Sequence, residues 1–223
     1  MKLYRFNGST TCRPVEMFAA EAGISLDLVD VNLMAGEHMG PAYTAKNPVQ
    51  QVPTLEDGDF RLVENAAILK YLADLVGSPA YPKDLKERAV VNAQMDFFNT
   101  SLSREFCYGH VYPQIMPSVG HEDPVVRQAM LERCGKNAQK FLRVLNDSLL
   151  SDAGPFLGGR AEPTIADYMG AAYATLGEMT RFDYSAYPRV QRWIAAMRAR
   201  PGWAAGHAGW EGWRDHVLSQ SAA

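Results

Sequence analysis

The segment from residue 9 to residue 14 carries the side chains best suited to chemistry. It reads Ser-Thr-Thr-Cys-Arg-Pro, so Ser9 and Cys12 stand three residues apart, the spacing of a dithiol redox motif whose first sulfur is replaced by oxygen. A serine hydroxyl is a poor nucleophile without a base, but it can donate a hydrogen bond to an incoming thiolate and lower the pKa of that thiol. The alternative is that Ser9 or a threonine caps the following helix.

Two other short segments carry candidate binding groups. A proline at a strand indicates an edge, a bulge or a cis peptide bond. A cis bond between Val52 and Pro53 would expose the Val52 backbone to an extended peptide, and an ordinary strand-start proline is the alternative. Asn65 is a favoured N-cap type, and the helix start beyond it could hold a carboxylate while Glu64 binds an ammonium. Together these groups suit an amino-acid zwitterion, and a plain helix cap is the alternative at Asn65.

Hydrophobic spacing predicts the elements that position these groups. We expect strands over residues 2–6, 26–31, about 52–55 and 60–63, and helices over residues 14–22 and 68–75. Their order gives a βαβ-ββα domain in which the three candidate segments fall at strand and helix ends. The opening β-α-β unit and the hairpin indicated by the Asp57-Gly58 turn together predict one compact domain of sheet and helices.

The rest of the chain contains only helical patterns, so the fold class is α+β. The segment GSPAYPKD, residues 77–84, indicates a linker. We expect a sheet domain over residues 1–78, a linker over 79–85 and an all-α domain over 86–223. Within the last domain, helical spacing covers 86–115, 124–150, 164–177 and 188–200. Thr164 and Asp167 predict a capping box that serves folding.

The helical domain offers one candidate surface for an apolar ligand. One helical face combines aromatic rings with flexible apolar side chains, from Tyr108, Tyr112 and either Ile115 or Met116. The alternative is that these side chains are buried in the core. Three tryptophans lie on one face of a C-terminal helix and are expected to pack this helix against the rest of the protein. Trp203 is also a candidate to line the mouth of the cleft between the two predicted domains. The three tryptophans are Trp203, Trp210 and Trp213.

Composition excludes several classes of protein. The 223 residues carry a net charge of −3, so the chain lacks the excess positive charge that is typical of proteins binding nucleic acid or an anionic membrane. No apolar run reaches the roughly 20 residues of a membrane span. The three cysteines are widely spaced, and they form no metal-binding cluster with the histidines, so neither disulfides nor a metal are expected. MKLYRF begins as a strand without a signal peptide, which predicts a soluble, cytoplasmic protein.

Six segments in a fixed order resemble the cytosolic glutathione transferase family, and the pattern is similar to its theta and delta classes. They are GSTTCRPV, VNLMAGEH, NPVQQVPTLEDG, LVENAAILKYL, FLGGRAEPTIADY and PGW. They run from residue 1 to about residue 80 and recur around residues 155–205, so they cover both predicted domains. The resemblance implies a thioredoxin-like N-terminal domain, glutathione as co-substrate, no metal, a homodimer and a detoxifying transferase.

The resemblance also implies roles for individual residues. Ser9 falls on the catalytic serine that hydrogen-bonds the glutathione sulfur. Val52 and Pro53 fall on the cis-proline pair that binds the cysteinyl backbone. Glu64 matches the acidic half of a Glu-Ser pair that holds the γ-glutamyl group. Asn65 replaces the serine of that pair, which predicts altered affinity rather than loss of binding.

The glycyl end of glutathione and the reaction complete these expectations. His38 matches a contact to the glycyl carboxylate, and Gln50 or Gln51 lies where relatives place another. The second substrate is expected to be a small hydrophobic electrophile, undergoing conjugation, dehalogenation or ether cleavage. Two alternatives stay open: a glutathione-dependent thiol–disulfide oxidoreductase that uses Cys12, and a non-catalytic ligand-binding protein.

Overall fold

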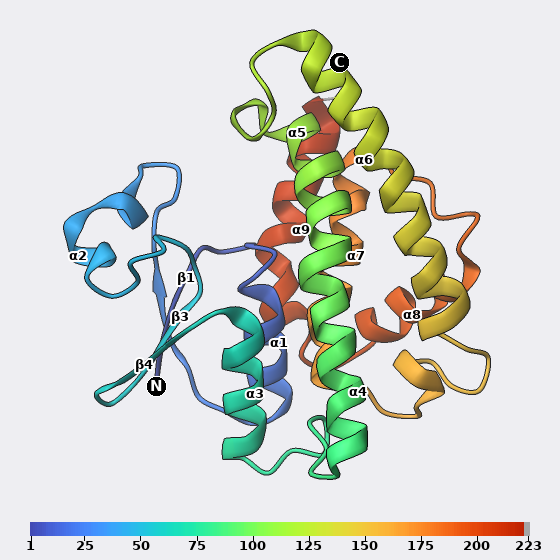
Figure 1. The fold of residues 1–223 in the computed structure, drawn as a ribbon. Coiled ribbons are helices and arrows are strands. Elements are labelled where there is room, and N and C mark those ends of the chain that lie inside the picture. Colours follow the sequence, from blue (N-terminus) through green and yellow to red (C-terminus); the bar gives the residue numbers. More distant parts are fainter. Residues whose placement is uncertain (221–223) are drawn as a thin grey trace.

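The computed structural model describes residues 1–220 and has the α+β architecture expected from the sequence (Figure 1). One four-stranded sheet has the order β2-β1-β3-β4, in which β2 runs parallel to β1 while β3 and β4 run antiparallel to their neighbours. The strands are β1 (Lys2–Arg5), β2 (Asp27–Asp30), β3 (Thr54–Asp57) and β4 (Phe60–Val63).

The helices fall into two groups along the chain. Three accompany the sheet: α1 (Arg13–Glu21), the short α2 (Pro41–Thr44) and α3 (Asn65–Leu75). The second group begins with α4 (Leu85–Asp96), which continues through π-helical turns (Phe97–Val111) into α5 (Tyr112–Ile115). It ends with α6 (Pro124–Val144), α7 (Ile165–Ala174), α8 (Pro188–Arg198) and α9 (Trp203–Gln220). No helix within residues 1–220 combines the length and apolarity that crossing a membrane requires.

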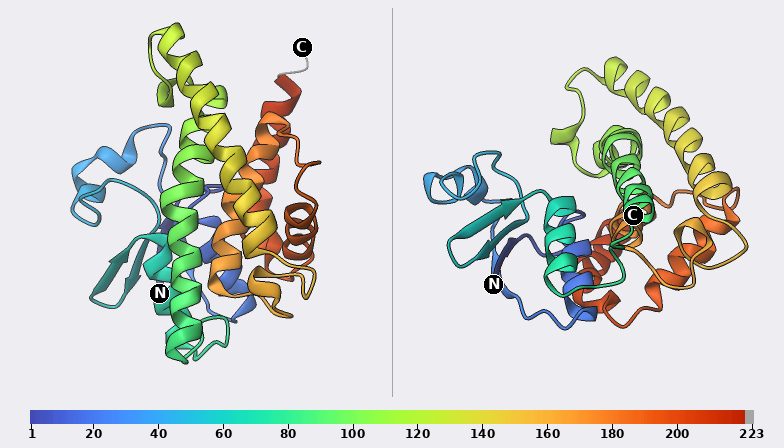
Figure 2. Two further views of the ribbon diagram at one scale, coloured as in Figure 1. Left: turned by 45° about the vertical axis from the view of Figure 1, so that its right-hand side comes forward. Right: turned by 60° about the horizontal axis from the view of Figure 1, so that its bottom comes forward.

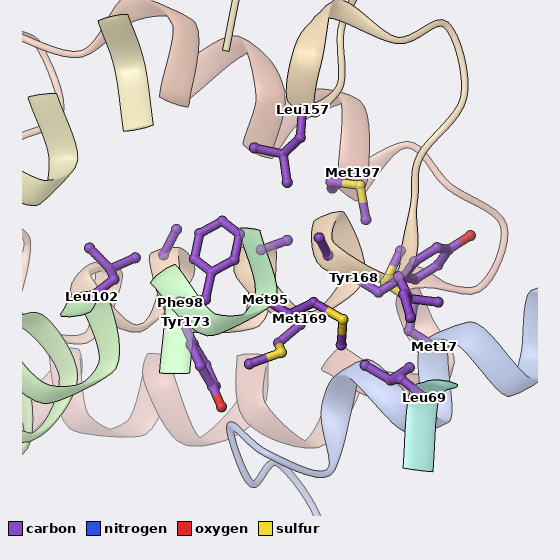
Figure 3. Packing of buried hydrophobic residues seen from close by; sticks show 14 of the residues in the cluster. Met17, Leu69, Met95, Phe98, Leu102, Leu157, Tyr168, Met169, Tyr173 and Met197 are labelled. Atoms are coloured by element: carbon purple, nitrogen blue, oxygen red, sulfur yellow. The ribbon is translucent and has the colours of Figure 1, made fainter. Parts of the chain in front are cut away.

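Helix α1 joins the two groups, because it lies between the sheet and the helical bundle (Figures 1 and 2). It packs against α3 on one side and against α7 and α9 on the other, and its residues from 13 to 19 are all buried. One hydrophobic cluster therefore extends across both groups of helices, and a second, smaller cluster lies on the sheet side at Cys12, Val31, Tyr43 and Val52. Figure 3 shows Met17 of α1 and Leu69 of α3 in the same cluster as Tyr168 and Met169 of α7.

The connection between α3 and α4 holds the predicted linker. Leu85, the last residue of the predicted 79–85 segment, already begins α4. The connection is packed against the bundle, because Tyr81 is buried and the Ala80 carbonyl accepts a hydrogen bond from the Ile165 N–H. Helix α7 begins at the predicted capping box of Thr164 and Asp167, which is confirmed.

Two predicted element starts are wrong by small amounts. Strand β3 begins at Thr54 rather than near residue 52, because Pro53 has no N–H to donate to the ladder. Helix α3 begins at Asn65 itself, and Glu64 occupies the N-cap position, so the prediction of Asn65 as N-cap is wrong. Both differences lie beside the candidate site.

Candidate active site

Sheet register brings the three candidate segments together. Tyr4, the residue before the last of β1, pairs with Thr54 at the start of β3, and Thr54 pairs with Val63 at the end of β4. The Ser9 loop follows β1, Val52 and Pro53 precede β3, and Glu64 follows β4. All of them therefore meet at one end of the sheet, where α1 also begins.

A cavity of about 230 Å³ opens between this end of the sheet and the helical group. One wall comes from the loops of the sheet domain and the other from the π-helical segment, α5, α7 and α9. The lining residues are Phe6, Ser9, Thr10, Thr11, Leu33, Met34, His38, Gln50, Gln51, Val52, Ser103, Cys107, Tyr108, Tyr112, Met116, Val119, Tyr173 and Trp213. Most of the predicted site residues thus share one cavity.

The hydroxyls of Thr10 and Thr11 bind neighbouring elements rather than the start of α1, and the Ser9 hydroxyl contacts Thr11 within the loop. Ser9 Oγ lies 3.1 Å from Thr11 Oγ1, and Thr11 Oγ1 donates to the Val52 carbonyl at 2.8 Å. Thr10 Oγ1 lies 2.8 Å from Tyr112 Oη, across the cavity. The N-cap of α1 is Cys12, which has no side-chain capping bond, so the capping alternative for this loop is wrong.

Cys12 lies behind the loop, away from the cavity. It is fully buried beside Val31, Tyr43 and Val52, and burial raises the pKa of its thiol to about 12. Such a thiol is almost entirely protonated near neutral pH and is a weak nucleophile. Cys107, by contrast, lines the cavity, but burial raises its pKa to about 12 as well.

Arg13 places a buried cation directly behind the Ser9 loop. It is fully buried, donates to Thr175 Oγ1 and the Ala172 carbonyl, and lies 4.3 Å from the centroid of the Trp210 ring. Desolvation lowers its pKa to about 10, so it stays charged at neutral pH. The sequence motif contained this residue, but nothing in its spacing indicated burial.

The peptide bond between Val52 and Pro53 is cis, and both residues are buried. Val52 lines the cavity, and its carbonyl accepts the hydrogen bond from Thr11. One lone pair of that carbonyl is therefore already used inside the protein, in contrast to the fully exposed backbone expected from the sequence. Pro53 supports this turn without lining the cavity.

Glu64 and Asn65 lie at the sheet end but outside the cavity lining. Glu64 is exposed and has a positive φ of 69°. Asn65 is buried and its Nδ2 donates to Tyr173 Oη at 3.2 Å, while Tyr173 itself lines the cavity. The Asn65 amide is therefore engaged with α7, a partner that the sequence did not predict.

His38, Gln50 and Gln51 line the cavity from the two loops around α2. Among the residues that the structure describes, His38 Nδ1 is buried without a hydrogen-bond partner. Gln50 donates to Thr44 Oγ1 at 2.9 Å, and the Gln51 carbonyl accepts from Tyr43 Oη at 2.7 Å. The contacts to Thr44 and Tyr43 fix the loop that carries Gln50 and Gln51 against α2.

The helical wall is aromatic. The Tyr108 and Tyr112 ring centroids lie 5.0 Å apart, Tyr108 is 53% exposed, and Met116 continues the same wall. Burial raises the pKa of both tyrosines, so both keep their protons at neutral pH. The wall thus offers apolar surface and neutral hydroxyl groups.

Trp203 does not line this cavity, which corrects the prediction for the cleft mouth. It is buried, its Nε1 donates to Glu211 Oε1 at 3.0 Å, and its ring stacks on His207. Trp213, which the sequence placed only in the sealing role, is the tryptophan of α9 that lines the cavity. Within residues 1–220, no group of three or more His, Cys, Asp or Glu side chains could hold a metal ion.

Comparison with known proteins identifies close resemblances over the whole chain. The family model "Glutathione S-transferase, N-terminal domain" matches residues 1–74. A delta-class glutathione transferase of Nilaparvata lugens is 30% identical, with 98% of each chain covered and a TM-score of 0.83. An unclassified glutathione S-transferase of Bombyx mori is 30% identical, with 98% of this chain and 97% of that chain covered and a TM-score of 0.81. A mutant of human glutathione-S-transferase T1-1 is 28% identical, with 98% and 89% covered and a TM-score of 0.81.

Proposed function

Because the chain belongs to the glutathione transferase family, we propose that it binds glutathione in the cavity beside Ser9 and activates its thiol. The activated sulfur attacks a small hydrophobic electrophile held by the helical wall. The observation that carries this proposal is the position of Ser9, which lines the cavity and is connected to the Val52 carbonyl by two hydrogen bonds through Thr11.

The sheet-side wall would supply binding and activation. The Val52 backbone, next to the cis proline, pairs with the cysteinyl backbone of the tripeptide and places its sulfur at Ser9. A hydrogen bond from Ser9 favours the thiolate over the thiol. Since a free thiol has a pKa of about 8.5, lowering it by about one unit multiplies the thiolate several-fold near neutral pH. His38 and Gln50 or Gln51 are proposed to hold the glycyl end.

The γ-glutamyl end would lie at the start of α3. Glu64 is exposed there and can pair with the ammonium group. One Asn65 Nδ2 hydrogen is bound to Tyr173, and the backbone N–H at the start of the helix is proposed to meet the α-carboxylate. This arrangement predicts weaker or altered binding compared with a serine at the same position.

The helical wall would position the electrophile. Tyr108, Tyr112 and Met116 present aromatic and thioether surface that accepts apolar ligands. The thiolate forms a bond to an electrophilic carbon, and the leaving group departs with the electron pair when the reaction is a substitution. Conjugation, dehalogenation and ether cleavage all share this first step. A cytoplasmic homodimer with a detoxifying role remains part of the proposal.

The test compares Ser9→Ala with Cys12→Ala against a panel of aryl halides, alkyl halides, aryl ethers and mixed disulfides. Loss of the donor to the sulfur predicts a fall in kcat/KM of about a hundredfold or more for Ser9→Ala. Cys12→Ala removes a buried sulfur outside the cavity and is expected to keep most of the activity. The converse pattern, with disulfide reduction lost only in Cys12→Ala, would favour the oxidoreductase alternative. Glutathione binding without turnover of any panel member would favour the non-catalytic one.

A further inference from the structure

The Ser9 hydroxyl is engaged by Thr11 on both of its hydrogen-bonding sides. Ser9 Oγ lies 3.1 Å from Thr11 Oγ1, and the Thr11 N–H donates to Ser9 Oγ at 3.3 Å. Both residues are half-buried and both line the cavity. The direction of the single Ser9 hydrogen therefore decides whether this hydroxyl faces Thr11 or the cavity.

Counting hydrogens settles that direction. Thr11 Oγ1 lies 2.8 Å from the carbonyl oxygen of Val52, which can only accept. A hydroxyl group has one hydrogen, so Thr11 donates it to Val52 and presents only lone pairs to Ser9. Ser9 is consequently the donor in the contact between the two hydroxyls.

A hydrogen that is held by Thr11 cannot at the same time stabilise a thiolate in the cavity. Donation to a sulfur requires Ser9 to give up its bond to the Thr11 oxygen. Ser9 Oγ can keep the bond from the Thr11 N–H during this change, because that bond uses a lone pair of the serine oxygen. A thiolate is charged and is the stronger acceptor, which favours the exchange.

We propose that Thr11 is a positioning residue, which holds the Ser9 hydrogen in the free protein and releases it when a thiolate arrives as the competing acceptor. This inference rests on the proposed function. The Val52 carbonyl then has two roles: it belongs to the backbone proposed to pair with the tripeptide, and its hydrogen bond from Thr11 makes Ser9 the donor between the two hydroxyls. The same carbonyl thus connects the peptide-binding turn to the direction of the Ser9 hydrogen.

The first test measures the ionisation of bound glutathione by the ultraviolet absorbance of its thiolate as a function of pH. Thr11→Val keeps the shape of the side chain and removes the competing acceptor. We expect about threefold more bound thiolate at a pH below the midpoint, from the loss of one modest hydrogen bond. Thr11→Ser restores the hydroxyl and should return the titration to that of the wild type. An unchanged or smaller thiolate fraction in folded Thr11→Val would overturn the inference.

The second test needs no ligand. Neutron diffraction from the free wild-type protein should place deuterium on Ser9 Oγ pointing to Thr11 Oγ1, and deuterium on Thr11 Oγ1 pointing to the Val52 carbonyl. A Thr11 deuterium that points to Ser9 would overturn the inference. If glutathione does not bind the wild type, the proposed function fails, while this measurement still decides whether Thr11 holds the Ser9 hydrogen.

Discussion

Helices α1 and α7 both begin near residues that carry hydroxyl groups, Thr10 and Thr11 before α1 and Thr164 before α7, yet these groups are used in opposite ways. At α7, Thr164 and Asp167 bind each other and the backbone at the start of their own helix. At α1, the hydroxyls of Thr10 and Thr11 bind Tyr112 and Val52, which belong to other elements.

The difference separates a structural helix start from a site. Asp167 is fully buried and accepts hydrogen bonds from the Leu157 N–H, the Trp193 Nε1–H and Thr164, so every partner is internal. Ser9, Thr10 and Thr11 instead line a cavity, and the hydroxyls of Thr10 and Thr11 bind residues of other elements. A helix start whose side chains satisfy its own backbone stabilises the fold, whereas one whose side chains reach across a cavity can serve a ligand.

The largest expected effect is on stability at the α7 start. Asp167→Ala leaves several buried donors without an acceptor, and each unsatisfied group costs about 1–3 kcal/mol, so we expect a loss of about 3 kcal/mol or more. Urea unfolding followed by circular dichroism measures it. The matched variant at the α1 start, Ser9→Ala, should cost less than about 1 kcal/mol. Equal losses in the two variants would break the distinction between the two helix starts.

Lowering the pH should reduce the free energy of unfolding through His207, a buried residue of α9, the helix that packs against α1. His207 is fully buried, and burial together with the nearby Arg13 cation lowers its pKa to about 2. An unfolded histidine titrates near pH ~6.5, so below that pH the unfolded state binds a proton that the folded state excludes. The free energy of unfolding should therefore fall by about 1.4 kcal/mol per pH unit as the pH drops below about 6.5.

The check compares urea unfolding of the wild type and His207→Phe between about pH 7 and about pH 5. Phenylalanine keeps an aromatic ring against Trp203, whose ring centroid lies 3.5 Å from that of His207. The variant is expected to lose this part of the pH dependence, whatever its absolute stability. A slope identical to that of the wild type would contradict the assignment to His207.

The smallest expected effect concerns the contact between Thr10 and Tyr112. Tyr112→Phe removes a 2.8 Å hydrogen bond that joins the Ser9 loop to the helical wall. We expect the free energy of unfolding to fall by about 1 kcal/mol. Under the proposed function, KM for the electrophile should rise while glutathione affinity stays close to that of the wild type. A larger change in glutathione affinity than in the electrophile KM would show that the two walls are not separate.

Hydrophobic spacing predicted the order of the elements because it depends only on neighbouring residues. Pro53 shifted the start of β3, since a missing N–H outweighs the apolar pattern around it. Thr10 and Thr11 stood in the motif, but their partners lie 102 and 41 residues away, and no local pattern contains that information. Their position in the site therefore appeared only with the fold.

The two differences between prediction and structure at Trp203 and at Asn65 have the same origin. Positions 203 and 213 lie about 80° apart around a helix of 3.6 residues per turn, so which of them faces the cavity depends on how α9 is rotated against α1. The partner of Asn65 is Tyr173, more than a hundred residues later in the chain. Sequence identified candidate residue types, and tertiary contacts decided their partners.

The most direct test of the central claim is a calorimetric titration of glutathione into the wild-type protein, paired with the absorbance of the bound thiolate. We expect saturable binding at one site per chain, with a lowered pKa of the bound thiol in the wild type and a normal one in Ser9→Ala. The absence of saturable binding to the wild type would contradict the account, as would an equally lowered thiol pKa in Ser9→Ala.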